Sequence, residues 1–274
     1  MNKLKIDKQV QVIASLVEGN SIRATCRITG VAKGTVLKLL ADVGGACAEY
    51  QDKALRNLDC KRIQCDEIWS FCYAKEKNVP KDKRGKFGYG DIWTFTAICA
   101  DTKLIPTWYV GKRDLEDATV FMKDLANRLK NRVQLTTDGH KMYLEAVEDA
   151  FGKDVDFSKL VKIYGQTEEG QKRYSPAQCT GIIKTKINGN PETENVSTSY
   201  VERQNLTMRM NMRRFTRLTN AFSKKAENLY YAVALHFMYY NFCRIHQTLR
   251  VTPAMEAGVI DHVWNIEDIL SLIK

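Results

Sequence analysis

The stretch RIQCDEIWSF, residues 62–71, decides how the rest of this 274-residue sequence is interpreted. Its Ile, Trp and Phe residues are typical of a β-strand, and Asp66 interrupts the apolar run. Burying a carboxylate without a partner costs free energy, so we expect Asp66 either to pair with a cation or to hold a metal ion. The stretch therefore predicts the first strand of a sheet and makes Asp66 a candidate site residue.

The residues after this strand predict a mixed sheet with helices on its faces. We expect the further elements in the order strand 91–100, strand 103–111, helix 114–130, strand 132–139, helix 142–152 and strand 157–165. Three successive strands followed by alternating helices and strands are typical of an α/β fold with a mixed sheet. The predicted α/β domain spans residues 61–250, and residues 165–198, which have little periodicity, are expected to form a loop-rich insertion in it.

The residues before this strand have helical periodicity and predict a separate all-α domain over residues 1–45. Ser21 can cap a short second helix, and Gly30 allows the turn into a third helix that we expect to end near Gly44. Two short helices joined by a glycine-containing turn, after a longer first helix, form the helix-turn-helix pattern. Residues 46–60 are then expected to be a linker to the sheet domain.

In a helix-turn-helix protein, the start of the last helix enters the major groove of DNA. The residues placed there are Lys33, Thr35 and Lys38, which give that helix a basic front with short side chains between. A three-helix bundle used only for dimerisation is the alternative. The basic front of the helix favours DNA.

A second basic segment, TSYVERQNLTMRMNMRRFTR (198–217), predicts one helix because it is rich in Met, Leu, Arg and Gln and contains no helix breaker. It carries five arginines and a single acid, Glu202, near its start. Residues 223–249 are apolar almost all round in their middle and predict a buried last helix. Residues 251–274 are expected to be a C-terminal tail.

Three acids from separate elements form the candidate metal site: Asp66, Asp138 at the end of a strand, and Glu202. Ligands gather beyond the carboxyl ends of strands in α/β sheets, and clustered carboxylates bind hard divalent cations. Two such ions, Mg²⁺ or alternatively Mn²⁺, can activate a water or a 3′-hydroxyl for phosphodiester chemistry. The alternative is structural, with Asp66 bonded to a backbone amide, Asp138 capping a turn and Glu202 favoured by the helix dipole.

Two neighbours of these acids are expected to have simpler roles. Glu67 points to the sheet face opposite Asp66 and is expected to be structural. His140 is expected to be an exposed histidine at the start of a helix. Neither is counted among the candidate ligands.

The composition favours a polyanionic partner. The net charge is +10 and the pI is about 9.1, and nucleic acid is the commonest polyanion bound by such proteins. Eight cysteines without a repeated C-x-x-C pair are expected to be reduced thiols. No signal peptide is expected, and the most apolar run, 229–240, is too short to cross a bilayer. We therefore expect a cytoplasmic, nucleoid-associated protein that binds double-stranded DNA and no membrane.

Four segments of the sequence carry a resemblance to a known family: IRATCRITGVAKGTVLKLL, CDEIWSFCYAK, TTDGHKMY and SYVERQNLTMRMNMRRFTRLTNAFSKKAEN. They look like that family's helix-turn-helix and the segments around its three catalytic acids, and the similarity covers nearly all of residues 5–250. The sequence resembles the bacterial insertion-sequence DDE transposases, specifically the insertion sequence one family and its longer relatives. The resemblance implies a ribonuclease-H-like catalytic fold, two Mg²⁺ ions, and cleavage and strand transfer at transposon ends.

Carried over residue by residue, the resemblance makes Asp66, Asp138 and Glu202 the catalytic, metal-binding acids. The DNA-binding residues expected from the charge pattern and the resemblance together are Lys33, Thr35, Lys38, Arg203, Asn205, Arg209, Arg213, Arg214 and Lys224. Members of the family commonly have a histidine where this chain has Leu229. Because transposition usually needs two ends held together, the resemblance also implies a homodimer on DNA.

Three other functions stay open at the level of sequence. A non-enzymatic helix-turn-helix regulator would bind DNA without a metal requirement, an inactive transposase remnant would keep the fold without the reaction, and a related nuclease would cut without joining. The enzyme requires the three acids to lie in one cluster, whereas the regulator does not.

Overall fold

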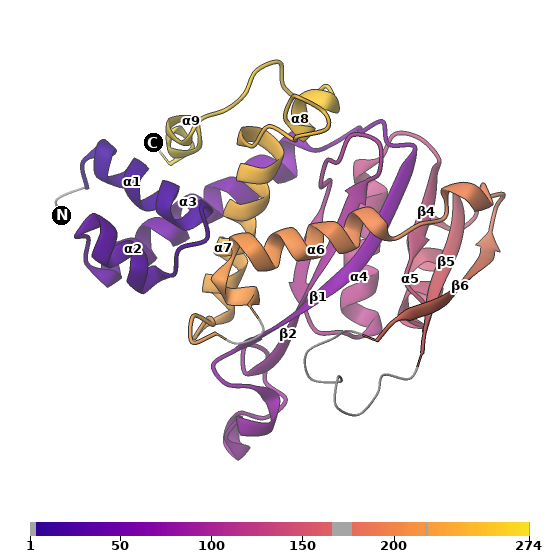
Figure 1. The fold of residues 1–274 in the computed structure, drawn as a ribbon, viewed down its shortest axis with the longest axis horizontal. Coiled ribbons are helices and arrows are strands. Elements are labelled where there is room, and N and C mark those ends of the chain that lie inside the picture. The colour runs from indigo at the N-terminus through magenta and orange to yellow at the C-terminus, as the bar shows by residue number, and fades with distance from the viewer. Residues whose placement is uncertain (1–3, 166–176, 217–218, 274) are drawn as a thin grey trace.

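The computed structural model of the chain describes residues 4–165, 177–216 and 219–273. Its centre is a six-stranded sheet in the order β3-β2-β1-β4-β5-β6 (Figure 1). The strands are β1 (Arg62–Cys72), β2 (Gly90–Cys99), β3 (Trp108–Gly111), β4 (Val133–Thr137), β5 (Val155–Tyr164) and β6 (Cys179–Asn188).

The directions of the strands follow the order of the elements along the chain. β1, β2 and β3 form an antiparallel meander. β4 lies parallel to β1, and β5 lies parallel to β4, and each of these two strands is reached through a helix. β6 then returns antiparallel to β5 at the edge of the sheet. The prediction of an α/β fold with a mixed sheet and flanking helices is therefore confirmed.

The two faces of the sheet are covered by different helices (Figure 1). One face is covered by α4 (Leu115–Arg128) and α5 (Met142–Phe151), and the other by α6 (Ser199–Asn211) and α7 (Ala226–Met238). Residues alternate between these faces along β1, so that Cys65 packs in the core under α4 and α5, while Ile68 packs under α6 and α7. Asp66 has the same parity as Ile68 and therefore faces α6.

Three helices precede the sheet: α1 (Ile6–Val17), α2 (Ile22–Thr29) and α3 (Lys33–Ala54). Ser21 caps α2 by accepting a hydrogen bond from the backbone N–H of Ala24 at 3.1 Å, as the sequence predicted. Gly30 closes α2 with a φ of 71°, in the left-handed region that favours glycine. The exposed first turn of α3 follows after two residues.

α3 is longer than the sequence predicted, so most of the expected linker over residues 46–60 is helix. The helix continues to Ala54 instead of ending near Gly44. Gly44 is buried where α3 meets α7, and a Cβ there would lie 2.6 Å from the Cβ of Tyr231. The glycine therefore permits close helix packing instead of ending the helix, and α1–α3 share one hydrophobic core with the sheet.

Residues 165–198, expected to be a loop-rich insertion, contain the strand β6. Its exposed side chains mix isoleucine with threonine and lysine, so it has no apolar alternation that the sequence could reveal. Residues 166–176 of this segment lie outside the described residues. The basic helix, α6, ends at Asn211, earlier than predicted, and its expected last residue, Arg217, also lies outside them.

The C-terminal part of the chain is more elaborate than one helix and a tail. α7 ends at Met238 instead of near residue 249, and a π-helical turn over Tyr239–Cys243 follows. The expected tail contains α8 (Pro253–Glu256) and α9 (Ile266–Ser271). α9 contacts α1 and α3, and its Ile269 is buried in their core. The tail is therefore part of the folded body.

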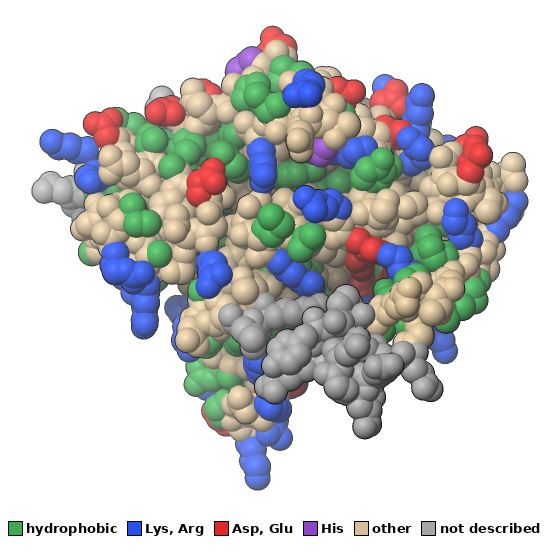
Figure 2. All heavy atoms as spheres, viewed as in Figure 1, with side chains coloured by type: hydrophobic (Ala, Val, Ile, Leu, Met, Phe, Trp, Pro, Cys, Tyr) green, Lys and Arg blue, Asp and Glu red, His purple; other side chains and the backbone are tan. Residues whose placement is uncertain are grey.

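The face of the molecule that carries α6 is rich in basic side chains. Figure 2 shows Lys and Arg side chains spread over this face, with a small group of acidic side chains near its centre. Across the described parts of the chain, no helix has the length and apolar character needed to cross a membrane.

Candidate active site

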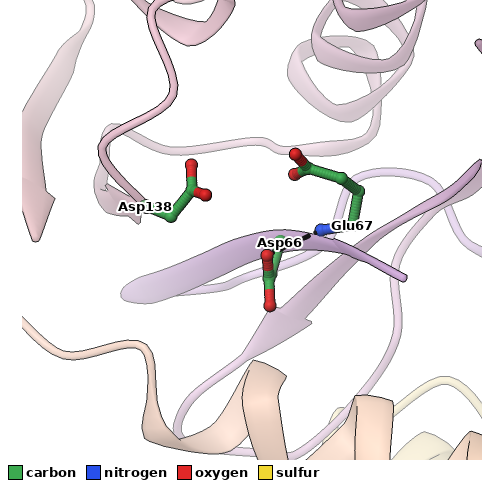
Figure 3. Close-up of side chains that lie close together, drawn as sticks. All are labelled: Asp66, Glu67 and Asp138. Atoms are coloured by element: carbon green, nitrogen blue, oxygen red, sulfur yellow. Dashed lines mark hydrogen bonds between the residues drawn. The ribbon is translucent and has the colours of Figure 1, made fainter. Parts of the chain in front are cut away.

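Asp66 and Asp138 lie side by side on neighbouring strands. β1 and β4 are parallel and pair in register up to the residue before each aspartate. One carboxylate oxygen each of Asp66, Glu67 and Asp138 lies within 4.8 Å of the other two (Figure 3). Asp138 follows the end of β4, where its Oδ1 accepts a hydrogen bond from the backbone N–H of His140 at 2.9 Å. The structure therefore brings together two of the three predicted acids.

Glu67 reaches this group of oxygens from the other face of the sheet. It points away from Asp66 (Figure 3), as strand alternation predicts. Its carboxylate is buried and is bonded to the guanidinium of Arg113 and, at 2.8 Å, to the hydroxyl of Tyr143 on α5. Arg113 also lies 3.7 Å from Asp138. Glu67 thus has a cationic partner of its own, and its structural role stays a prediction.

β1 also fixes α6 above the acids. The side-chain oxygen of Gln64 accepts hydrogen bonds from the backbone N–H groups of Tyr200 and Val201, at 2.8 and 3.2 Å, and satisfies the first turn of the helix. Two residues later, on the same face of β1, Oδ2 of Asp66 accepts a hydrogen bond from Nδ2 of Asn205 at 2.8 Å. Alternate side chains of one strand therefore hold the helix at two points.

Glu202 lies on α6, one turn before the residue that bonds Asp66, but its carboxylate has other partners. Its oxygens lie 2.6 and 2.5 Å from Nζ of Lys162 on β5, and the hydroxyl of Thr198 donates to it at 2.6 Å. Its oxygens are not in the group that Asp66 and Asp138 form. The expectation that all three acids meet is therefore fulfilled for two of them, while the third is held at Lys162.

The electrostatic surroundings of Asp66 are unusual for an aspartate. Burial raises the pKa of Asp66 to about 7, and the negative charges of Glu67, Asp138 and Glu202 add to this effect. The backbone N–H of Glu67, which donates to Oδ1 of Asp66 at 2.8 Å, acts in the opposite direction. The carboxylates thus repel one another, and a cation bound among them would relieve that repulsion.

The donor set fits a hard divalent cation. It consists of carboxylate oxygens, the ligands that Mg²⁺ and Mn²⁺ prefer, and within the described ranges no cysteine or histidine belongs to the group. Asp66 and Asp138 would hold such an ion, because neither has a cationic partner as close as that of Glu67. Glu202 would join them only after leaving Lys162.

The predicted DNA contacts on α3 are accessible. Lys33 and Thr35 are exposed in its first turn, and Lys38 is exposed one turn later. Lys38 forms an ion pair with Asp42 at 2.7 Å along the helix surface. Such exposed pairs contribute little stability, so Lys38 can exchange this partner for a phosphate.

The predicted DNA contacts on and after α6 divide into two sets. The exposed set is Arg203, Arg213 and Lys224. Asn205 is buried, and its side-chain amide donates a hydrogen bond to Asp66. Arg209 and Arg214 are half-buried, and burial lowers the pKa of Arg214 to about 10. The exposed set is therefore accessible to a partner, whereas these three side chains are covered in part or in full by the fold.

Two other residues singled out by the sequence take ordinary places. His140 is half-buried, and its Nδ1 accepts a hydrogen bond from the backbone N–H of Met142 at 3.4 Å, so it is less exposed than predicted. Leu229 is buried in the hydrophobic core between α7 and the sheet. Neither residue adds a polar group to the acids.

Sequence reasoning missed four side chains that organise the site: Gln64, Arg113, Tyr143 and Lys162. Two of them are among 42 lysines and arginines, and nothing in the local sequence distinguishes them from the others. A signal was available for Gln64, because it has the same parity as Asp66 on a predicted strand and must share its face.

No protein-family model matches the chain, and no curated protein matches it. The family suggested by the four sequence segments therefore stays a resemblance. What the fold and the site define is an acidic cluster on a mixed α/β sheet, with a basic helix fixed beside it.

Proposed function

We propose that the chain is a metal-dependent DNA transposase that cleaves the ends of an insertion sequence and joins them to target DNA. The observation that carries this proposal is the meeting of Asp66 and Asp138 under α6, the helix that also bears Glu202 and the exposed Arg203. Acids that bind divalent ions beside arginines that bind phosphate are what phosphodiester chemistry requires. As the resemblance seen in the sequence implies, we further propose that the protein acts as a homodimer on double-stranded DNA in the bacterial nucleoid.

The arrangement of elements supports the folds that this function needs. An antiparallel meander of β1, β2 and β3, with β4 and β5 parallel to β1 on its other side, is compatible with a ribonuclease-H-like fold. The capped α2, the turn at Gly30 and the exposed front of α3 support a helix-turn-helix domain. Both inferences agree with the resemblance seen in the sequence.

Each residue near the acids has a separate role in this proposal. Asp66 and Asp138 hold the divalent ions, which when bound activate the attacking oxygen and stabilise the leaving oxygen. Asn205 orients Asp66 by donating to Oδ2, and the backbone N–H of His140 orients Asp138. Arg203, which is exposed on the outer side of α6, binds a phosphate of the DNA strand.

Glu202 is the part of the triad that must change partners. It serves as a third ligand only if it leaves the ammonium of Lys162 and the hydroxyl of Thr198. Lys162, once released, would be available to a phosphate oxygen beside the acids. The pair therefore stabilises the protein before metal and DNA are bound.

A non-enzymatic DNA-binding protein, either a regulator or an inactive transposase remnant, is the second candidate. The pairing of Glu202 with Lys162 and Thr198 favours it, because that pairing satisfies the carboxylate without a metal. If the pairing persists in the presence of Mg²⁺, the triad stays incomplete. DNA binding would then depend on salt concentration and not on the divalent ion.

The test is nicking of a duplex that carries the element's own ends, with and without Mg²⁺ or Mn²⁺. Changing Asp66, Asp138 or Glu202 singly to Ala is expected to abolish nicking while DNA affinity stays within about twofold, because metal ligands rather than phosphate contacts are lost. Asp149→Ala is the matched control, since Asp149 is an exposed acid on α5 paired with Lys123 at 2.8 Å. Undiminished nicking by any one of the three variants would refute the proposal.

A further inference from the structure

A pocket beside α6 is not explained by the acids. It measures about 420 Å³, which lies in the size range of pockets that bind small molecules or groups. Its polar and aromatic lining includes Lys103, Tyr200, Arg203, Tyr240, Arg244 and His246. None of the described residues that line it is acidic. The pocket is therefore suited to an anion.

α6 separates this pocket from the acids. In a helix with 3.6 residues per turn, Tyr200 and Thr207 fall on one flank, whereas Glu202 and Asn205 fall on the other. Arg203 lies on the outer side between these flanks and is exposed. A helix with its side chains is about 10–12 Å across, which equals the rise of about three base pairs along the axis of a duplex that crosses the helix. One DNA strand can thus reach both flanks.

The cations of the pocket lack counter-charges. The guanidinium groups of Arg203 and Arg244 form no hydrogen bond or ion pair with any residue in the described parts of the chain, and only the backbone of each residue is bonded. The ammonium of Lys103 contacts backbone carbonyl oxygens and lies 3.8 Å from the ring centroid of Tyr200. Positive charges gathered without acids repel one another, so a bound anion would stabilise this region.

The surroundings of His246 reflect the same excess of positive charge. Its pKa is lowered by burial and by the charges of Lys103 and Arg244. Its Nδ1 is buried and has no hydrogen-bond partner among the residues that the structure describes. A bound anion would raise the pKa of His246, which gives the pocket a spectroscopic reporter.

We propose that this pocket binds a backbone phosphate of the DNA substrate, about three nucleotides from the phosphate at the acids. The identity of the polyanion rests on the proposed function, whereas the anion site rests on the pocket alone. A strand that crosses the outer side of α6 would pass Arg203 between the two places. Arg244 and Lys103 would then bind the phosphate in the pocket and set how the strand lies across the helix.

The test removes one phosphate charge from the DNA, one side-chain charge from the protein, or both. Duplexes that carry one methylphosphonate at successive positions are bound to the full chain without divalent metal. The wild-type protein is expected to lose about fivefold in affinity at one position about three nucleotides from the nick. Arg244→Gln is expected to bind unmodified DNA about fivefold more weakly, with a salt slope smaller by about one, and to show no further loss at that position.

Arg56→Gln is the matched control, because Arg56 lies at the end of α3 and pairs with Asp52 outside the pocket. Arg56→Gln should lose affinity at the same methylphosphonate position as the wild-type protein. A wild-type profile in Arg244→Gln would overturn the proposal even if nicking is observed. If the methylphosphonate at that position no longer weakens binding in Arg244→Gln, the site is supported even if no nicking is found. Failure of the proposed site can therefore be distinguished from failure of the proposed function.

A second measurement separates DNA from free phosphate as the source of the anion. The imidazole of His246 is titrated by NMR in the full chain, alone, with inorganic phosphate and with the duplex. The duplex is expected to raise the pKa of His246 in the wild type and to leave it unchanged in Arg244→Gln. A rise with inorganic phosphate but not with the duplex would overturn the assignment to DNA.

Discussion

Asp66 and Glu67 are neighbours in the sequence, and burial raises the pKa of both carboxyl groups, yet the sheet gives them different partners. Glu67 lies on the face covered by α5, where a guanidinium and a phenol hydroxyl bind its carboxylate. Asp66 lies on the face covered by α6, where an amide side chain and a backbone N–H, both neutral, donate to it. The charged form of Glu67 is therefore stabilised by a cation of the chain, whereas the charged form of Asp66 has only neutral donors.

The largest expected effect is on the nicking rate, which should fall much more when Asp66 is replaced than when Glu67 is replaced. Under the proposed function, Asp66→Asn should lower the Mg²⁺-dependent nicking rate by about 10³-fold or more, because a metal ligand is lost. Glu67→Gln should lower the rate by less than about tenfold, because Glu67 acts only through its neighbours. Single-turnover nicking of one duplex measures both rates, and equal losses would remove the distinction between the two acids.

The next effect is on stability, because Glu67→Gln and Asp66→Asn should change the free energy of unfolding in opposite directions. Glu67→Gln weakens the hydrogen bonds that Arg113 and Tyr143 donate to the carboxylate and should lower the free energy of unfolding by about 1 kcal/mol. Asp66→Asn removes a repelled carboxylate and should raise that free energy by about 2 kcal/mol at pH 8 without metal. Urea unfolding measures both, and a loss of stability in both variants would contradict the comparison.

The pH dependence should sharpen the same contrast. Burial raises the pKa of Asp66 to about 7 from its ordinary value of 3.8, so the folded chain binds this proton more tightly than the unfolded chain. The contribution of the protonated group is complete below about pH 4 and is lost as the pH rises through about 7. The advantage of Asp66→Asn over wild type should therefore be small at pH 4 and grow by at most about 1.4 kcal/mol per pH unit up to pH 7. An advantage that stays constant with pH would contradict this account of Asp66.

The smallest effect concerns the third acid. Lys162→Met should free Glu202 and strengthen Mg²⁺ binding by about fivefold, because a cation no longer competes for the carboxylate. Lys159→Met, on the same strand, is the control and should leave the affinity unchanged. Calorimetric titration with Mg²⁺ measures both, and an unchanged affinity in Lys162→Met would favour the non-enzymatic candidate.

The elements that the sequence predicted well are those with a clear period or a local signal. The strand around Asp66 and the cap at Ser21 are examples, since alternation and capping depend on nearby residues. Gly44 was interpreted as a helix end because its partner, Tyr231, is far away in the sequence. β6 escaped prediction because its exposed residues do not alternate.

The site shows the same limit. Asp66 and Asp138 could be predicted because Asp66 interrupts an apolar strand and Asp138 comes where another strand ends, and parallel strands bring such positions together. The pairing of Glu202 with Lys162 could not be predicted, because it depends on how α6 packs on the sheet and on which of many lysines lies within reach of Glu202. Contacts across the fold, rather than local patterns, decide the protonation and the partners of each acid.

The unbroken course of α3 has a mechanical consequence. Its 22 residues, at a rise of about 1.5 Å each, make a rigid rod of about 33 Å, which is close to one turn of B-DNA. The helix packs tightly against α7 at Gly44, so its first residue, Lys33, is held at a fixed distance and angle from the sheet. One inserted residue would swing Lys33 by about 100°, whereas four would nearly restore its direction one helical turn further out.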